Sequence, residues 1–198
     1  MLLFNSQISG NCYKVRLLLA QLGVRYERRE VDVVDRSNRV ELLAELNPAL
    51  RVPTLVLDDG RALAESNAIL WYFGADTPYL PTDRFERAKV LQWMFFEQYC
   101  HEPNIAVVRF WVTYAGAPAP AAQVEARRRD GYAALDAIER HLAGASFLVA
   151  DSYTIADIAL YAYTHVADEG GFDLAGYPAI RAWLDRVAAQ PGHSPITD

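Results

Sequence analysis

The sequence predicts two domains, an α+β N-terminal domain followed by an all-α helical bundle. Residues 1–76 alternate short apolar runs with stretches of helical periodicity. Proline and aspartate then punctuate residues 77–83, which we expect to form a linker. From 84 to 198 the apolar residues recur at helical spacing, which indicates a purely helical second domain.

The first half of the N-terminal domain is predicted to run strand, helix, strand, helix. Leu2–Asn5 is an apolar run that stops at polar residues, as a short buried strand does. Apolar residues at i, i+3, i+4 and i+7 before Gly23 then predict a helix: Val15, Leu18, Leu19 and Leu22. Arg25–Val33 is strand-like, and a charged helix is expected over Asn38–Leu46, before Asn47–Pro48.

A hairpin and a third helix complete the N-terminal domain. Asp58–Asp59–Gly60 is a strong hairpin turn, so Val52–Leu57 and Arg61–Leu63 are expected to pair as neighbouring strands. Glu65–Gly74 then has an apolar helical face. The order β-α-β-α-β-β-α, with the hairpin after the second helix, is that of a thioredoxin-like domain.

The second domain is predicted from its helix breaks and caps. A long helix beginning near Arg84 should kink or break at Pro103, whose ring removes a backbone donor. Thr154 and Asp157 stand three apart before an apolar face, which predicts a capping box with Asp in the reciprocal position. Two further helices are expected, at Ala121–Ala143 and from Pro178 onward.

Composition and charge exclude several classes of function. Hydrophobic residues make up 52% of the 198 residues and charged residues 22%, as in a packed globular protein. The net charge is −6 without a basic stripe, so nucleic acid is not an expected partner. Two cysteines are too few for a disulfide framework, no histidines have metal-site spacing, and we find neither a signal peptide nor a membrane span. We therefore expect a cytoplasmic protein without a metal.

Ser9–Gly10–Asn11 lies between the first strand and the first helix, where chemistry is possible. A helix N-terminus favours an anion, and a serine hydroxyl there can donate to a bound thiolate. Lowering a thiol pKa of about 8.5 by two units needs roughly 2.7 kcal/mol, which a charge-assisted hydrogen bond and the helix terminus could supply. The alternative is that Ser9 or Asn11 merely caps the helix.

Two further pairs open the third strand and the third helix. Val52–Pro53 enters the strand, and a cis bond there would turn the Val52 backbone outward to pair with an extended peptide. Ser66 can cap the following helix while its exposed donors hold a carboxylate, and Glu65 can pair with an α-amino group. Taken separately, a trans bond and ordinary capping remain alternatives.

Together these three features resemble the glutathione S-transferase family. The resemblance extends over nearly the whole chain and includes Arg-Val-Pro-Thr-Leu at 51–55, Glu-Ser-Asn-Ala-Ile-Leu at 65–70 and the Thr154–Asp157 cap. It implies the glutathione S-transferase fold, with Ser9, assisted by Asn11, at the thiol. It also implies that Val52, before cis-Pro53, binds the cysteinyl backbone and that Glu65 and Ser66 hold the γ-glutamyl end.

Within the family the chain resembles bacterial, serine-type members, either theta-like or nu-like. Ser9 falls where theta-like members carry their catalytic serine, while Ser9 and Asn11 together resemble the Thr-x-Asn pair of certain bacterial, nu-like members. Cysteine-dependent classes are disfavoured, because no cysteine stands at position 9 and Cys12 is interpreted as a packing residue. The chain also lacks the Ser-Ser-Cys motif of the zeta class, which counts against maleylacetoacetate isomerisation.

Two peripheral contacts and a second substrate are also implied by the resemblance. Arg51 could reach the glycyl carboxylate of glutathione, and Asn38 stands where theta-like members often place a histidine; a surface role is the alternative for both. The second substrate is expected against the long helix, and six residues are candidates by position: Tyr13, Tyr99, His101, Arg109, Phe110 and Trp111.

The function expected from the resemblance is conjugation of glutathione to a hydrophobic electrophile, in detoxification. The alternatives are glutathione-dependent reduction of peroxides or disulfides and a non-catalytic glutathione-binding interaction module. A homodimer is expected, with apolar surface offered by the third helix through Ala68, Ile69, Trp71 and Tyr72.

Overall fold

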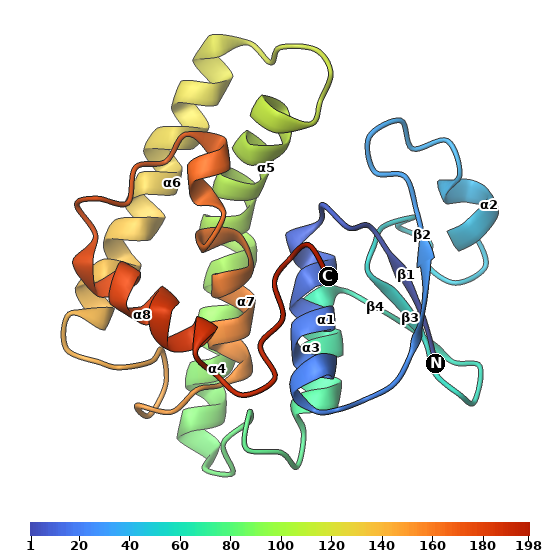
Figure 1. Cartoon of the computed structure of the whole chain (residues 1–198), viewed down its shortest axis with the longest axis horizontal. Helices are drawn as coiled ribbons and strands as arrows, with labels where there is room; N and C mark the ends of the chain where they lie inside the picture. Colours follow the sequence, from blue (N-terminus) through green and yellow to red (C-terminus); the bar gives the residue numbers. More distant parts are fainter. The chain divides into compact units, whose positions relative to one another are not determined.

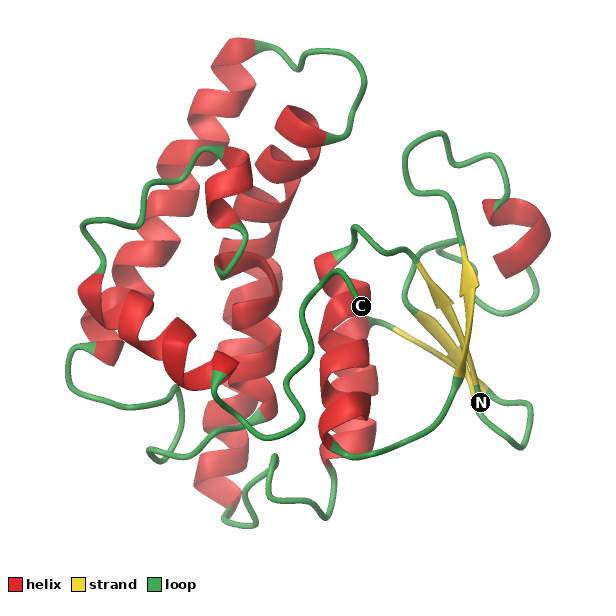
Figure 2. Ribbon diagram, viewed as in Figure 1, coloured by secondary structure: helices red, strands yellow, loops and turns green.

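Two structural units make up the computed structural model, which describes all 198 residues. One unit consists of Met1–Thr77 together with Pro191–Asp198, and the other is Pro78–Gln190. The first unit contains the sheet, while the second is built from helices (Figure 2). The sequence alone assigns residues 191–198 to the helical domain, whereas in the structure they belong to the first unit.

A four-stranded sheet of order β2-β1-β3-β4 forms the centre of the first unit. Strand β1 is parallel to β2 and antiparallel to β3, which pairs antiparallel with β4. In this register Leu3 lies opposite Arg28 on one side and Leu55 on the other. The strands are β1 (Leu2–Asn5), β2 (Glu27–Glu30), β3 (Thr54–Val56) and β4 (Ala62–Ala64). This topology confirms the thioredoxin-like domain.

Helices cover both faces of the sheet (Figure 1). They are α1 (Gly10–Gln21), α2 (Arg39–Leu43) and α3 (Ser66–Gly74). Successive side chains of a strand point to opposite faces, so Leu3 and Phe4 enter different cores. Leu3 packs in a cluster with Val15 of α1 and Ile69 of α3, while Phe4 packs with Leu43 of α2. Helices α1 and α3 therefore share one face, and α2 lies on the other.

The second unit is an all-α bundle, as the sequence predicts. Its first helix ends in a π-helical turn at Glu97–His101, and Pro103 falls in the first turn of the helix that follows. A missing N–H costs little there, because the first turn has no intrahelical acceptor for it. The elements are α4 (Arg84–Phe96), η1 (Glu97–His101), α5 (Glu102–Thr113), α6 (Ala121–Leu142), α7 (Ile155–Thr164), η2 (Ala167–Gly170) and α8 (Pro178–Ala188).

The predicted capping box stabilises α7, which is buried along its whole length. Thr154 Oγ1 accepts from the Ala156 N–H at 3.3 Å, and the Asp157 carboxylate accepts from the Thr154 N–H at 2.9 Å. That carboxylate also accepts from the Leu148 N–H at 3.0 Å and from Trp183 Nε1 at 2.9 Å. Asp157 thus joins α7, α8 and the preceding loop. In the whole structure, the helices fall short of the length and apolarity needed to cross a membrane.

Candidate functional site

Ser9 sits at the N-terminus of α1, directly after the loop that leaves β1. Its backbone is extended, with φ −80° and ψ 118°, and its Oγ accepts from the Cys12 N–H at 3.3 Å. Ser9 therefore caps the helix. Capping uses a lone pair of the oxygen and leaves the hydroxyl proton free to be donated, and the side chain is partly exposed. The two roles considered for Ser9 are thus compatible.

Asn11 and Ser66 meet, although 55 residues separate them in the sequence. The Ser66 hydroxyl donates to Asn11 Oδ1 at 3.3 Å, and Lys14 Nζ lies 3.4 Å from Ser66 Oγ. Asn11 is partly exposed, Ser66 is 4% exposed and Lys14 is fully buried. Sequence reasoning missed Lys14, because a lysine on a helix is ordinarily expected to face solvent.

The start of α3 carries a strained backbone. Glu65, its N-cap residue, has φ 66° and ψ 115°, in the left-handed range that a residue with a side chain rarely adopts. Its side chain is exposed and makes no capping hydrogen bond to the helix. Such strain occurs at functional sites more than elsewhere. The geometry leaves the Glu65 carboxylate exposed to solvent at the start of α3.

The loop before β3 is organised by Asn47, which sequence reasoning treated as a helix stop. Its Nδ2 donates to the Arg51 carbonyl at 3.1 Å and to Thr54 Oγ1 at 3.0 Å, and its Oδ1 accepts from the Ala49 N–H at 3.0 Å. Thr54 Oγ1 donates to the same Arg51 carbonyl at 2.8 Å. The Val52–Pro53 bond inside this loop is cis, which confirms that prediction.

Asn38 and Arg51 lie on the α2 side of the sheet. Asn38 precedes α2, and its Oδ1 accepts from the Asp32 N–H at 3.0 Å, so this oxygen holds the loop. Arg51 is exposed. Burial lowers the pKa of Arg39, the nearby positive charges of Arg36 and Arg51 lower it further, and the negative charge of Asp32 raises it.

Cys12 is a packing residue. It is fully buried, and its Sγ accepts from the Ser6 N–H at 3.3 Å. Burial raises the pKa of this thiol to about 11, more than the Ser9 and Ser6 hydrogen bonds lower it. A thiolate is therefore scarce at neutral pH, and Cys12 is no candidate for a nucleophile.

Residues 191–198 run beside the first turns of α1. The Tyr13 hydroxyl donates to the Ser194 carbonyl at 2.7 Å, and Arg16 Nη2 donates to the Ile196 carbonyl at 2.7 Å. Gln7 Nε2 donates to the Ile196 and Asp198 carbonyls at 2.8 and 2.9 Å. This segment therefore covers the polar side of α1 close to Ser9. No periodic pattern in the sequence predicts this arrangement.

The residues expected at a second substrate differ in exposure. His101 is buried with its Nε2 2.9 Å from Thr164 Oγ1, and Arg109 is buried with its Nε 2.8 Å from Glu169 Oε2. Tyr99, in contrast, is 85% exposed. The contacts of His101 and Arg109 hold the helical unit together, and their part in binding a substrate stays a prediction.

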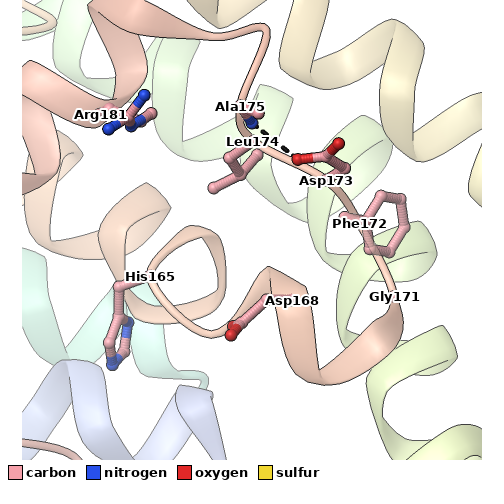
Figure 3. Close-up of a pocket in the computed structure, with 8 residues that line it drawn as sticks. All are labelled: His165, Asp168, Gly171, Phe172, Asp173, Leu174, Ala175 and Arg181. Atoms are coloured by element: carbon pink, nitrogen blue, oxygen red, sulfur yellow. Dashed lines mark hydrogen bonds between the residues drawn. The ribbon is translucent and has the colours of Figure 1, made fainter.

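The second unit also has an open cavity of about 550 Å³ near α8 (Figure 3). Eight residues line it: His165, Asp168, Gly171, Phe172, Asp173, Leu174, Ala175 and Arg181. None of the predicted site residues is among them. No group of three or more His, Cys, Asp or Glu side chains in the structure could hold a metal ion.

Comparison with known proteins agrees with the fold. Residues 8–76 match the family model of the glutathione S-transferase N-terminal domain, and 96–191 match that of the C-terminal domain. The structure resembles a glutathione S-transferase from Pseudomonas fluorescens, with a TM-score of 0.94, 47% identity, and coverage of 100% of this chain and 98% of that one. For one from Xanthobacter autotrophicus the TM-score is 0.92 and the identity 45%, covering 98% and 96%.

Sequence relatives extend the same likeness. Glutathione S-transferase 3 of Zea mays is 30% identical over 96% of this chain and 89% of its own length. The disulfide-bond oxidoreductase YfcG of Escherichia coli is 28% identical over 91% of this chain and 87% of its own. Both domains, their order and nearly the full length are therefore matched, and the chain belongs to the glutathione S-transferase family of enzymes.

Proposed function

We propose that the first unit binds glutathione and that the enzyme conjugates the glutathione thiolate to a hydrophobic electrophile. The observation that carries the proposal is the Ser66–Asn11 hydrogen bond of 3.3 Å, which joins the N-terminal ends of α3 and α1. Two helix N-termini, each favourable to negative charge, lie side by side in this arrangement. Glutathione can place one of its negative groups at each terminus, the thiolate at α1 and the α-carboxylate of its γ-glutamyl residue at α3.

The thiolate would lie at the start of α1. Ser9 is partly exposed, and its cap geometry directs a lone pair to the Cys12 N–H while the hydroxyl proton remains to be donated. The amide of Asn11 offers a second donor two residues further along the chain. Lowering the thiol pKa by two units takes roughly 2.7 kcal/mol. A donor to a charged group is worth about 1.5–3 kcal/mol, so one hydroxyl and the helix terminus suffice.

The two ends of the peptide would be held by separate groups. At the γ-glutamyl end, the exposed Glu65 carboxylate pairs with the α-ammonium, and the backbone N–H of Ser66 at the start of α3 receives the α-carboxylate. The Val52 backbone, before Pro53, pairs with the cysteinyl residue. At the glycyl end Arg51 receives the carboxylate, and Asn38 contributes through its amide nitrogen, because its oxygen already binds the Asp32 N–H.

In the proposed reaction the protein stabilises the thiolate and orients it. The thiol proton leaves to solvent, and the sulfur electron pair forms the new sulfur–carbon bond. With an aryl halide the halide departs with the carbon–halogen electron pair, whereas with an epoxide or an enal the displaced electron pair stays on the substrate, which takes up a proton from solvent. No enzyme nucleophile takes part, since Cys12 is buried with a raised pKa. We expect the reaction to proceed without a metal.

A calorimetric titration with glutathione tests the binding, and a panel of aryl halides, epoxides and enals tests the reaction. We expect saturable binding and a product whose formation rate rises with pH as bound thiol ionises. If the intact, folded protein gives no heat of binding with glutathione at millimolar concentration, the proposal is overturned. Binding without any conjugation would leave a glutathione-binding interaction module.

Reduction of disulfides or peroxides by glutathione is the second candidate. It is favoured by the likeness to the disulfide-bond oxidoreductase YfcG. Two glutathione molecules would be oxidised to glutathione disulfide while one substrate disulfide is reduced to two thiols, so no protein cysteine is needed. Coupling to glutathione reductase measures this activity in the same preparation. A reductase rate exceeding every conjugation rate would make it the main function.

We also propose a homodimer. Large apolar side chains are exposed on α3 and along α4 into η1, namely Tyr72, Phe85, Phe95 and Tyr99. Such surface favours association. Ile69 does not contribute, contrary to the expectation from the sequence, because it is 1% exposed and packs in the sheet core. Light scattering at micromolar concentration checks the proposal, and a particle of 22.2 kDa would contradict it.

A cytoplasmic location and a role in detoxification complete the proposal. Glutathione is abundant where thiols stay reduced, and the chain's two cysteines are both free. Fractionation of cells that carry a tagged copy tests the location. Increased sensitivity of a deletion strain to electrophiles, reversed by the wild-type gene but not by a Ser9→Ala copy, tests the role.

A further inference from the structure

Lys14 is a buried cation beneath the proposed glutathione site. It is one of only two lysines in the chain, and its side chain is 0% exposed. Removing an ammonium from water is costly even when it finds partners, and an apolar side chain of similar volume often fits such a position better. Packing alone would therefore not favour a lysine at this position, and its hydrogen-bond partners indicate another role.

The contacts of Lys14 lead to the site in two steps. Its Nζ donates to Ser66 Oγ at 3.4 Å, and the Ser66 hydroxyl donates to Asn11 Oδ1 at 3.3 Å. A hydroxyl has one proton to donate and two lone pairs that accept. Because an ammonium can only donate, Lys14 occupies the oxygen of Ser66 as an acceptor. The proton of Ser66 is then directed to Asn11.

These two hydrogen bonds, from Lys14 to Ser66 and from Ser66 to Asn11, form a relay that orients the amide of Asn11. The oxygen and the nitrogen of an amide lie on opposite branches, so an Oδ1 held by Ser66 turns Nδ2 the other way. Asn11 lies in the first turn of α1, two residues from the partly exposed Ser9, and is itself partly exposed. In the opposite orientation Oδ1, a hydrogen-bond acceptor, would face a thiolate and repel it.

We propose that Lys14 is a positioning residue of the glutathione site, which acts through Ser66 to keep the donor end of the Asn11 amide toward the thiolate. This inference rests on the proposed glutathione function. Lys14 does not touch the ligand, because none of its surface is accessible. It presets the polarity of the site before glutathione arrives, as preorganised catalytic dipoles do.

The test is a titration of bound glutathione by the ultraviolet absorbance of its thiolate, in wild type, Lys14→Met and Lys14→Arg. Lys14→Met removes the donor, and Lys14→Arg retains one. Lys89→Met, which removes the chain's other lysine from the surface of α4, controls for the loss of one positive charge. Thermal melting of each variant, with glutathione affinity by calorimetry, separates stability and binding from thiol ionisation.

We expect Lys14→Met to raise the apparent pKa of the bound thiol by about one unit, which lowers the ratio of thiolate to thiol about tenfold at a given pH. Its melting temperature should stay level or rise, since a buried charge has been removed. A merely structural role would instead lower stability and leave the thiol pKa unchanged. Lys14→Arg should recover most of the ionisation, and Lys89→Met should match wild type.

A double-mutant cycle with Asn11→Ala distinguishes the relay from direct action of the charge. If the relay operates, Lys14→Met has little further effect once Asn11 is gone. An equal effect in both backgrounds, or a Lys14→Met protein that ionises glutathione as wild type does, would overturn the inference. Should Lys14→Met fail to fold, Ser66→Ala breaks the same relay at its middle and is judged by the same cycle. Absence of glutathione binding by wild type would instead reject the proposed function itself, and the inference with it.

Discussion

Replacing Ser9 with alanine should damage the protein in two separable ways. The structure shows that Ser9 Oγ caps α1 through the Cys12 N–H at 3.3 Å, and the proposed function gives the hydroxyl proton to the thiolate. Ser9→Ala removes both interactions. Ser9→Thr retains a hydroxyl for both, and Ser9→Asp keeps a capping acceptor while placing a negative charge against the thiolate. The three variants together separate the cap from the donor.

The two losses have different magnitudes. Loss of the cap costs about 1 kcal/mol of the free energy of unfolding, because one N–H of the first turn loses its acceptor. For a chain of this length that corresponds to a decrease of roughly 2–4 °C in melting temperature. Loss of a donor to a charged group is worth roughly 1.5–3 kcal/mol, or about ten- to a hundredfold in the rate of conjugation at neutral pH.

The measurements are melting temperature, glutathione affinity and the pH dependence of the conjugation rate. Ser9→Ala should shift the pH profile upward by one to two units, on the order of the donor energy. Affinity should change little, because both ends of the peptide are held elsewhere. Ser9→Asp should melt like wild type yet react as slowly as Ser9→Ala. If Ser9→Ala loses stability but keeps the wild-type pH profile, Ser9 is only a cap, and Asn11 or the backbone donors of α1 activate the thiol.

Four other perturbations have defined outcomes. Glu65→Ala should weaken glutathione binding by about 1–3 kcal/mol, which calorimetry measures; unchanged affinity would remove Glu65 from the ligand site. Asp157→Ala strands buried donors on three residues and should cost roughly 3 kcal/mol or more, seen as a melting point lower by about 6–12 °C. Deleting residues 191–198 should lower the unfolding midpoint and slow conjugation, whereas a shortened chain identical to wild type would make this segment dispensable. A thiol reagent at pH 8 should modify the partly exposed Cys100 and spare Cys12 until the protein unfolds, because burial raises the pKa of Cys12 to about 11; modification of both in the native state would contradict the packing assignment.

Where local chemistry decides the structure, the sequence is enough to predict it. The hairpin turn ends in Gly60 at φ 85°, as a turn of this kind requires. Pro178 begins α8, and the Thr154–Asp157 box begins α7. Each of these features depends on residues within a few positions of one another, and each can therefore be derived from spacing and backbone preference alone.

Where long-range pairing decides, the sequence predicts less. The expected strand at 25–33 is reduced to Glu27–Glu30, whose four residues are all exposed. Nothing in its own side chains makes this segment a strand; it is one because β1 pairs with it. The predicted helix at 38–46 is reduced to Arg39–Leu43: Asn38 Oδ1 accepts from the Asp32 N–H instead of capping the helix, and at the other end the N–H groups of Leu46 and Asn47 both bind the Leu43 carbonyl.

Helix α1 shows why part of the site escapes sequence reasoning. Its apolar positions predict a helix with one buried face, yet every residue from Cys12 to Leu19 is buried, including Tyr13, Lys14 and Arg16. A buried polar side chain needs a hydrogen-bond partner. Ser66 supplies one for Lys14, and the backbone carbonyls of segment 191–198 supply them for the other two. The sequence does not show which backbone carbonyls will act as acceptors, because every residue has one.

The need for these acceptors also explains why segment 191–198 belongs to the first unit. Tyr13 and Arg16 are buried, and without a cover the donors that bind the carbonyls of Ser194 and Ile196 would be hydrated. An irregular segment has unpaired carbonyls to offer, whereas those of a helix are largely consumed within it. The segment therefore completes the burial of α1 and fixes the first turn that presents Ser9 and Asn11. The geometry of the proposed thiolate site thus depends on residues more than 180 positions away in the chain.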